Sequence, residues 1–310
     1  LKISSFNVLN YFTTLGERGA YTEEDLVRQT DKIVEAMLKI DADVFGLQEL
    51  ENNGFDDASD IQALVDALNT ELIEQGRGDE LYTFVTPTDG SPIGSDAITT
   101  GMIYRPGALS VVATETYVYE ETSADTTFAI AERLHEFADR DYVGDYQRNR
   151  PTVATTFEDA NGEQFTLAVN HFKSKGPSGL SDLAEDIQAK LDAGTIPAEH
   201  VDQVQADLDA LLADPNYDQG DGQGFWAQVR EDAGQELHEW LTTDYVGAGL
   251  DPDILVIGDL NTYAKGDSVQ ELVDGGNMTD LLTQYLGEEA YSYAFDGQRG
   301  SLDPALASDS

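Results

Sequence analysis

Short apolar stretches alternate with longer amphipathic stretches along the chain. Apolar runs and alternating patterns predict strands at residues 2–6, 44–47, 102–104, 109–112, 153–157, 165–169 and 254–257. The last run is unbroken and bounded by turn residues, which is typical of a central strand covered on both faces. Apolar side chains at helical spacing predict helices over residues 26–38, 61–73 and 235–241, and Thr22 with Asp25 resembles a helix N-terminus. The pattern predicts a mixed α/β fold.

One segment, residues 177–224, differs in composition from the rest. It holds 11 acidic residues, one lysine and few aromatic residues. Its apolar positions predict two acidic amphipathic helices, and strand patterns resume directly afterwards. We therefore expect a single domain over residues 1–310 with an acidic surface insertion at about 177–224.

Composition excludes several classes of protein. The chain has no cysteine, so it has no disulfide scaffold, thiol nucleophile or cysteine-ligated metal site. No apolar run reaches the roughly 18 residues that a membrane span needs. With 40% hydrophobic residues the chain has enough apolar material for a core.

The charge is the most unusual quantity, because 60 Asp and Glu stand against 17 Lys and Arg, a formal net charge of −43. Such a surface repels nucleic acids and acidic membranes at low salt. We interpret it as the acidic coat of a protein from a salt-loving organism. A calcium-binding surface is the alternative, but the sequence lacks the acidic loop of an EF-hand.

Polar residues recur where the predicted strands end, in a pattern that indicates a metal site. They are Asn7, Glu49, Asn170, His171, Asp259, Asn261 and, near the end of the chain, Asp303. Functional groups of layered folds gather in the loops at one edge of a sheet. Carboxylate and amide oxygens with one imidazole suit a hard divalent ion such as Mg²⁺.

Seven of the 17 basic residues lie in or beside the same segments. Among the seven that do so are Arg105, Arg148, Arg150 and Lys173. Arginine suits bidentate phosphate contacts and lysine a looser point contact. Together with the strand-end residues they predict an oxygen-ligand metal site with a phosphate-binding rim.

Nine stretches, in this order, carry a family resemblance: 6–12 (FNVLNYF), 41–49 (DADV leading to QE), 51–54 (ENNG), 101–106 (GMIYRP), 148–151 (RNRP), 169–175 (VNHFKSK), 220–224 (GDGQG), 257–261 (IGDLN) and 291–298 (YSYAFDGQ). The chain resembles the endonuclease/exonuclease/phosphatase superfamily. It is most similar to secreted bacterial nucleases of the extracellular nuclease M type, which are related to pancreatic-type deoxyribonuclease.

The resemblance implies a four-layer α/β sandwich of two mainly antiparallel sheets flanked by helices. It also implies a secreted, sequence-tolerant DNA endonuclease that uses Mg²⁺ or Mn²⁺, with a structural Ca²⁺ as a further possibility. By motif, Glu49 is the principal metal ligand with Asn7 in support. His171 assists a phosphate oxygen or the leaving group, Asp259 orients or deprotonates the attacking water, and Asn261 holds the phosphate.

Further residues are implied as substrate contacts, and one position departs from the family pattern. Arg105, Arg148, Arg150, Asn170 and Lys173 are implied as phosphate or DNA contacts. The family sequence Ser-Leu-Asp-His has its histidine replaced here by Pro304, after Asp303, and proline cannot exchange a proton. If the histidine at this position takes part in catalysis in relatives, we expect the activity of this chain to be impaired.

Two alternatives to an active DNase stay open: a catalytically inactive DNA- or phosphate-binding relative, and a lipid or inositol phosphoesterase of the same superfamily. The net charge disfavours anionic lipids, and no exposed aromatic hairpin for membrane docking is evident from the sequence. We expect no membrane partner and a monomer that acts on DNA. The chain begins with Leu1 and shows no signal peptide, so we expect a processed chain or an excised domain, extracellular by resemblance.

Overall fold

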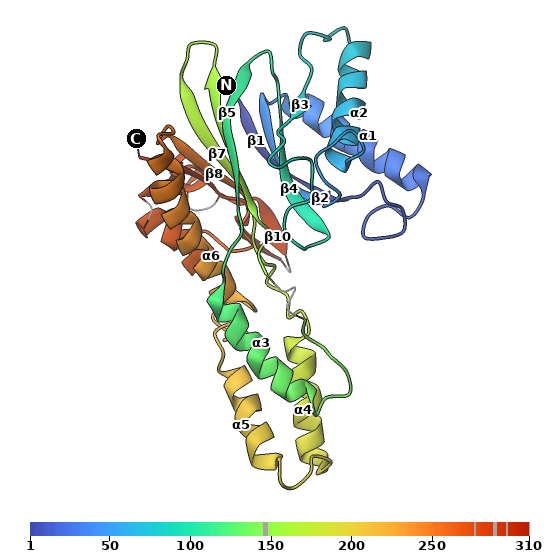
Figure 1. Ribbon diagram of the computed structural model, residues 1–310, viewed down its shortest axis with the longest axis vertical. Helices are drawn as coiled ribbons and strands as arrows, with labels where there is room; N and C mark the ends of the chain where they lie inside the picture. The colour runs from blue at the N-terminus through green and yellow to red at the C-terminus, as the bar shows by residue number, and fades with distance from the viewer. Residues whose placement is uncertain (145–147, 276, 288–289, 296, 310) are drawn as a thin grey trace.

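Two β-sheets pack face to face, and helices cover their outer faces (Figure 1). A computed structural model describes residues 1–144, 148–275, 277–287, 290–295 and 297–309. Asp296, within the 291–298 stretch, therefore lies outside the described residues. The predicted α/β sandwich with two mainly antiparallel sheets is confirmed. Within the described ranges no helix is long and apolar enough to cross a membrane.

The first sheet has four strands in the order β1-β2-β4-β3. Their bounds are β1 (Ile3–Tyr11), β2 (Val44–Glu51), β4 (Ile98–Tyr104) and β3 (Thr83–Phe84). β1 and β2 are parallel, and the other pairs are antiparallel. Helices α1 (Glu23–Ile40) and α2 (Asp60–Glu74) pack on this sheet and against each other. The predicted start of α1 is confirmed, since the Thr22 hydroxyl accepts a hydrogen bond from the Asp25 backbone N–H at 3.1 Å.

The second sheet has six strands in the order β5-β6-β7-β8-β12-β9. Their bounds are β5 (Leu109–Tyr117), β6 (Thr152–Asp159), β7 (Gln164–His171), β8 (Ile254–Asp259), β12 (Ala305–Ser308) and β9 (Met278–Asp280). β7 and β8 are parallel, and the remaining pairs are antiparallel. Helix α6 (Ala227–Glu239) continues into the π-helical segment η1 (Trp240–Tyr245), and both pack on this sheet.

Apolar side chains from both sheets form one core between them. Val44 of β2, Val169 of β7 and Ile257 of β8 belong to a single buried cluster. The sheets approach closely at Gly46, because a Cβ there would lie 2.6 Å from Val169 Cγ2 and 2.7 Å from Ile257 Cδ1. The sheets are therefore held in one position along β2, β7 and β8, the strands that end in candidate site residues.

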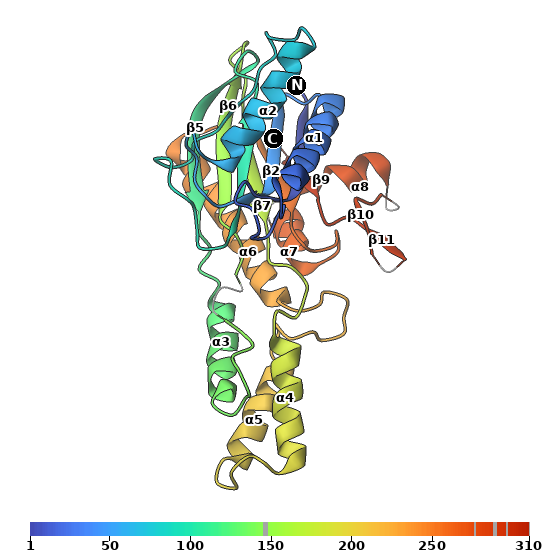
Figure 2. The same ribbon diagram turned by 90° about the vertical axis from the view of Figure 1, so that its right-hand side faces the viewer.

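A helical arm extends from the sandwich (Figures 1 and 2). It consists of α3 (Thr122–His135), α4 (Leu180–Ala193) and α5 (Val201–Leu212), which share their own buried apolar cluster. The two helices predicted within 177–224 are confirmed as α4 and α5. The sequence did not predict α3, because its buried stripe includes Ala124, Thr127 and Ala131, which are weak hydrophobic signals.

Short elements complete the chain at its C-terminal end. They are η2 (Val246–Ala248), α7 (Asp267–Gln270), η3 (Glu271–Gly275), α8 (Leu281–Leu286) and a hairpin of β10 (Tyr293–Phe295) and β11 (Gln298–Gly300). The hairpin stands beside α8, away from the two sheets (Figure 2). Tyr293 is 42% exposed and the preceding Tyr291 is 48% exposed. The expectation of no exposed aromatic hairpin was wrong, because its strands of three residues are too short to leave a periodic pattern.

Glu121 lies buried at the junction between β5 and α3 and links the arm to the sandwich. Its Oε1 accepts a hydrogen bond from the Asn149 backbone N–H at 2.7 Å, whereas its Oε2 is buried without a hydrogen bond. Burial raises the pKa of Glu121 from 4.5 to about 7. Because the pKa is higher in the folded state, protonated Glu121 stabilises that state relative to an ionised carboxyl group. This contribution to the free energy of unfolding is lost as the pH rises from about 4.5 through about 7.

Substitution Glu121→Gln should therefore stabilise the protein at alkaline pH. We expect the free energy of unfolding to rise by about 3 kcal/mol at pH 9 and hardly at all at pH 4. Urea unfolding at both pH values measures this difference. The exposed neighbour, in the variant Glu120→Gln, controls for the general effect of removing one negative charge. An equal gain in both variants would show that burial of Glu121 is not the cause.

Candidate active site

Four polar side chains come together where parallel strands of the two sheets end. Asn7 is on β1 and Glu49 is near the end of the adjacent parallel strand β2. His171 and Asp259 are paired at the ends of the parallel strands β7 and β8. The negative charge of Glu49 contributes to the raised pKa of Asp259, so the two strand ends face each other across the sandwich. The predicted gathering of these residues at one edge is therefore observed.

Glu49 is presented by an irregularity in β2. The pairing of β2 with β4 shifts register between Gln48 and Leu50, and Glu49 has a φ of +66°. A bulge with a residue in the left-handed region redirects a side chain at a local energetic cost, and such strain concentrates at functional sites. Glu49 Oε1 accepts a hydrogen bond from Asn7 Nδ2 at 3.0 Å, and Oε2 accepts one from the Asn10 N–H at 2.8 Å.

The Glu49 region is suited to a divalent cation. The carboxylate uses one hydrogen bond on each oxygen, so lone pairs remain for a ligand. Asn10 Oδ1 lies buried beside it without a hydrogen-bond partner. Across the described ranges, however, no group of three His, Cys, Asp or Glu is arranged to hold a metal ion. This donor set fits Mg²⁺, which is commonly bound through one or two carboxylates together with waters and substrate phosphates.

His171 is a neutral imidazole next to an acid. It is 4% exposed, and burial, with Arg150 as a secondary cause, holds its pKa well below 6.5. Its Nε2 lies 3.9 Å from Asp259 Oδ2, and its Nδ1 is buried without a hydrogen bond. The two side chains do not form an ion pair at this distance while the imidazole is uncharged. A neutral imidazole has one N–H, so His171 can donate a hydrogen bond to an incoming oxygen.

Asp259 has the chemical properties of a general base. Burial, together with the nearby carboxylates of Asp303 and Glu49, raises its pKa from 3.8 to about 7. Its Oδ1 accepts a hydrogen bond from the Asn261 N–H at 2.9 Å. Asn261 Nδ2 in turn donates to the Phe172 carbonyl at 2.9 Å, which fixes this amide at the edge of the site. A carboxyl group with a pKa near neutrality is well matched to proton transfer.

Asp303 approaches from the last part of the described chain. The Leu260 N–H donates to the Leu302 carbonyl at 3.0 Å, which joins the turn after β8 to this segment. The Ser292 hydroxyl accepts a hydrogen bond from the Asp303 N–H at 3.3 Å. Burial raises the pKa of Asp303. Pro304 is buried directly before β12.

Three of the predicted basic residues lie around this edge. Arg150 is 8% exposed, donates to the Phe172 carbonyl at 3.0 Å and pairs with Asp96 at 2.9 Å. Lys173 donates to two serine hydroxyls at 2.9 and 3.0 Å, and burial lowers its pKa to about 7. Arg148 pairs with Asp125 at 2.5 Å at the base of the arm. Whether these residues contact substrate stays a prediction.

Two other predicted contacts are corrected by the structure. Arg105 follows β4, where β4 pairs with the first residue of β2, at the end of the sheet opposite Glu49. There it pairs with Asp41 at 2.6 Å. Asn170 is fully buried, and its amide bonds Thr152 and two strand carbonyls. Neither side chain is placed to contact a phosphate at the strand-end site.

Sequence reasoning missed Arg18, which lies in the loop between β1 and α1. Arg18 pairs with the other oxygen of Asp96 at 3.2 Å, and its charge helps lower the pKa of His171. No motif marks this loop, so only the fold brings Arg18 beside Arg150 and His171. The two guanidinium groups bracket Asp96 and bring positive charge to the histidine.

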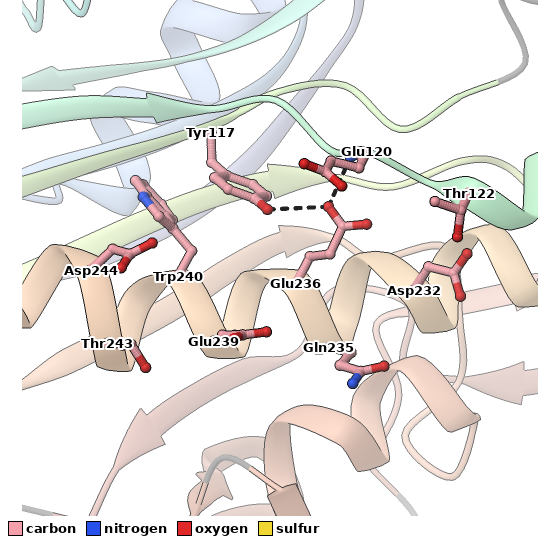
Figure 3. A pocket seen from close by; sticks show the side chains of 10 residues that line it. All are labelled: Tyr117, Glu120, Thr122, Asp232, Gln235, Glu236, Glu239, Trp240, Thr243 and Asp244. Atoms are coloured by element: carbon pink, nitrogen blue, oxygen red, sulfur yellow. Dashed lines mark hydrogen bonds between the residues drawn. The ribbon is translucent and has the colours of Figure 1, made fainter.

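A separate acidic groove lies where the arm joins the sandwich (Figure 3). Its volume is about 400 Å³, and Tyr117 donates a hydrogen bond to Glu236 within it at 3.2 Å. None of its described lining residues is Lys, Arg or His, and five are acidic. This groove is therefore unsuited to a phosphate, and the strand-end site is the candidate for phosphate chemistry.

Comparison with known proteins places this fold in a family. The model of the Endonuclease/Exonuclease/phosphatase family matches residues 4–308, and no curated protein matches the chain. An endonuclease/exonuclease/phosphatase family protein from Bacteroides thetaiotaomicron is 16% identical, with a TM-score of 0.53 over 99% of this chain and 81% of that one. The human Nocturnin catalytic domain with bound sulfate anion is 15% identical, with a TM-score of 0.51 over 100% and 83%. A β-hairpin deletion mutant of Staphylococcus aureus beta toxin is 14% identical, with a TM-score of 0.50 over 100% and 87%. The chain belongs to the Endonuclease/Exonuclease/phosphatase family.

Proposed function

We propose that this chain is a divalent-metal-dependent phosphodiesterase that hydrolyses DNA, as a secreted, salt-tolerant and sequence-tolerant endonuclease of the extracellular nuclease M type. The observation that carries the proposal is the convergence of Glu49, Asp259 and neutral His171 at one edge of the sandwich. Arg150 and Arg18 bring positive charge to the same edge.

Each side chain has a role that its environment supports. Asp259, as a carboxylate, accepts a proton from the attacking water, and Asn261 keeps that carboxylate oriented. His171 donates its N–H to a phosphate oxygen and carries no charge that would compete with the cation. Glu49, supported by Asn7, would hold Mg²⁺ or Mn²⁺, which neutralises charge that builds on the phosphoryl oxygens.

The direct test is conversion of supercoiled plasmid DNA with and without added metal. We expect hydrolysis with Mg²⁺ or Mn²⁺ and none in EDTA. Hydrolysis that persists in EDTA would contradict a metal-dependent mechanism. A further assay in which Ca²⁺ replaces Mg²⁺ or Mn²⁺ as the only added ion shows whether Ca²⁺ supports turnover or has only a structural role.

Activity should be flat or should rise between about 0.1 and about 1 M NaCl. The Debye length falls from about 10 Å to about 3 Å over this range, so repulsion between the −43 surface and DNA fades. Initial rates on plasmid DNA at fixed Mg²⁺ measure the trend, with a basic nuclease as the control that should lose activity. A steep, monotonic loss of rate would show that the acidic surface is not an adaptation to salt.

A lipid phosphoesterase is the second candidate, and exposed side chains at the C-terminal end favour it. Tyr285 and Leu286 of α8 are 76% and 69% exposed, near the exposed Tyr291 and Tyr293. Turnover of phospholipids or sphingolipids in zwitterionic vesicles, without cleavage of DNA, would favour this function over the first.

An inactive relative is the third candidate, and position 304 offers its test. The variant Pro304→His is compared with the unchanged chain for DNA hydrolysis. A gain of about 10²–10⁴-fold would trace impaired activity to Pro304. Equal rates would remove any role of this position in catalysis.

A further inference from the structure

A cavity of about 740 Å³ is lined in part by residues that are close in sequence to Asn261 and Asp303. Two chain segments that carry proposed active-site residues continue into its wall. Tyr263 and Lys265 follow Asn261, and Arg299 and Ser301 precede Asp303. Because consecutive Cα atoms are about 3.8 Å apart, the Ser301 Cα lies within about 7 Å of the Asp303 Cα. The cavity therefore adjoins the strand-end site and is not a remote surface feature.

Among the described residues that line the cavity, two are basic and one is acidic, whereas the molecule as a whole is strongly acidic. Lys265 and Arg299 are both exposed, and in the described part of the chain neither forms an ion pair, although acidic residues outnumber basic ones by 60 to 17. Asp280 is the one acidic residue among the described lining residues. Its carboxylate is already engaged, since it accepts hydrogen bonds from the Leu282 N–H at 3.0 Å and the Thr283 hydroxyl at 2.6 Å.

Aromatic rings position Arg299 and one wall of the cavity. The Arg299 guanidinium lies over the Tyr291 ring, 4.7 Å from its centre, which leaves the N–H groups at its rim available to an anion. Gly300 packs so closely on Tyr263 that a Cβ would lie 2.3 Å from the ring. Lys175 Nζ lies 4.3 Å from the centre of the Tyr263 ring. The contact with the Tyr291 ring therefore positions Arg299, and the contact with Gly300 positions the Tyr263 ring, before a ligand binds.

We propose that this cavity is an anion subsite that binds a phosphate of the substrate strand other than the one that is cleaved. The inference rests on the proposed function and adds a residue-level account of how a polynucleotide is held. Lys265 acts as a point charge, and Arg299 donates two parallel hydrogen bonds to phosphate oxygens. Phosphates follow one another at about 3.4 Å of rise per strand, so the subsite takes a phosphate within a few nucleotides of the scissile bond.

The test compares a substrate that reaches the cavity with one that does not. The double variant Lys265→Gln/Arg299→Gln is assayed on a single-stranded oligonucleotide and on bis(p-nitrophenyl) phosphate, a diester with no neighbouring phosphate. We expect KM for the oligonucleotide to rise roughly tenfold or more with kcat within about twofold, because a remote contact binds ground state and transition state alike. Kinetic constants for the small diester should not change.

A matched control is present in the same chain. Arg140 lies over the Tyr142 ring at the same 4.7 Å and is exposed, and Lys39 is exposed on α1. The double variant Lys39→Gln/Arg140→Gln removes the same charge from other parts of the surface. An equal rise of KM in the control variant, or an equal loss on the small diester, would overturn the subsite.

A binding measurement separates this inference from the proposed function. Inorganic pyrophosphate is titrated calorimetrically into the full chain in EDTA, so no turnover is needed. Binding that is lost in Lys265→Gln/Arg299→Gln and kept in the control supports the subsite, even if the protein cleaves no DNA. Pyrophosphate binding that is equal in all three proteins, or absent from the unchanged chain, overturns it.

Discussion

The variant Asp259→Asn should lose hydrolytic activity and, at the same time, become more stable. Asp259 is held where burial and two nearby carboxylates raise its pKa to about 7, so the ionised form costs folding free energy above that pH. Asparagine has nearly the same shape and carries no charge. Its side-chain oxygen can still accept the hydrogen bond from the Asn261 N–H.

The two effects have different magnitudes and different assays. We expect the rate of DNA hydrolysis to fall about 10²–10⁴-fold, the usual loss for a positioned acid–base group. In metal-free buffer at pH 9 the free energy of unfolding should rise by about 3 kcal/mol, whereas at pH 3 it should hardly change. The sign follows from linkage, because a raised carboxyl pKa contributes stability at low pH that is lost as the pH passes 7.

The control for the variant Asp259→Asn is Asp253, at the opposite end of strand β8. Asp253 is exposed and directly precedes β8. The variant Asp253→Asn therefore removes one negative charge without changing a residue of the candidate active site. Loss of activity together with loss of stability in Asp259→Asn would mean that the residue is structural. Gain of stability with unchanged activity would remove Asp259 from the mechanism.

The variant Glu49→Gln should lose both metal affinity and turnover. Both carboxylate oxygens of Glu49 accept hydrogen bonds, at 3.0 Å from Asn7 Nδ2 and at 2.8 Å from the Asn10 N–H. An amide can preserve only one of these bonds and carries no charge for a cation. We expect the rate to fall about 10³-fold or more, since the charge stabilisation that a bound metal supplies is worth several kcal/mol.

Binding of Mn²⁺, followed by its electron paramagnetic resonance signal, measures the affinity without turnover. Glu51→Gln is the matched control, because Glu51 ends the same strand and accepts a hydrogen bond from the Thr14 N–H at 3.0 Å, which glutamine can also accept. We expect its Mn²⁺ affinity and rate to stay within about threefold of the unchanged chain. Unchanged Mn²⁺ binding in Glu49→Gln would place the metal elsewhere.

Where hydrophobic periodicity was strong, the sequence predicted the fold well. The unbroken run at 254–257 predicted a central strand, and β8 lies between β7 and β12. The elements that escaped prediction are short or weakly apolar. β9 and β12 have three and four residues, too few to display a period, and α3 buries Ala124 and Thr127 along with larger side chains.

The site was predicted in part, for a reason that Asn170 and His171 illustrate. They are consecutive residues on β7, and successive side chains of a strand point to opposite faces. The sequence named both, but the structure turns the Asn170 amide into the interior and leaves the His171 ring beside Asp259. The prediction for Arg105 was wrong for a related reason. Strand β4 runs antiparallel to β2, so the end of β4, which Arg105 follows, lies beside the start of β2 and far from Glu49.

By itself the sequence determined the strand ends, the oxygen-rich residues at them and the acidic surface, because these follow from local periodicity and composition. Only the tertiary structure decided which of those residues meet. Close packing at Gly46 brings the two sheets together, so that the charge of Glu49 helps to raise the pKa of Asp259. The loop after β1 brings Arg18 near His171, where its charge helps to lower the pKa of the imidazole. Such contacts depend on strand direction, register and the distance between sheets, which no local pattern encodes.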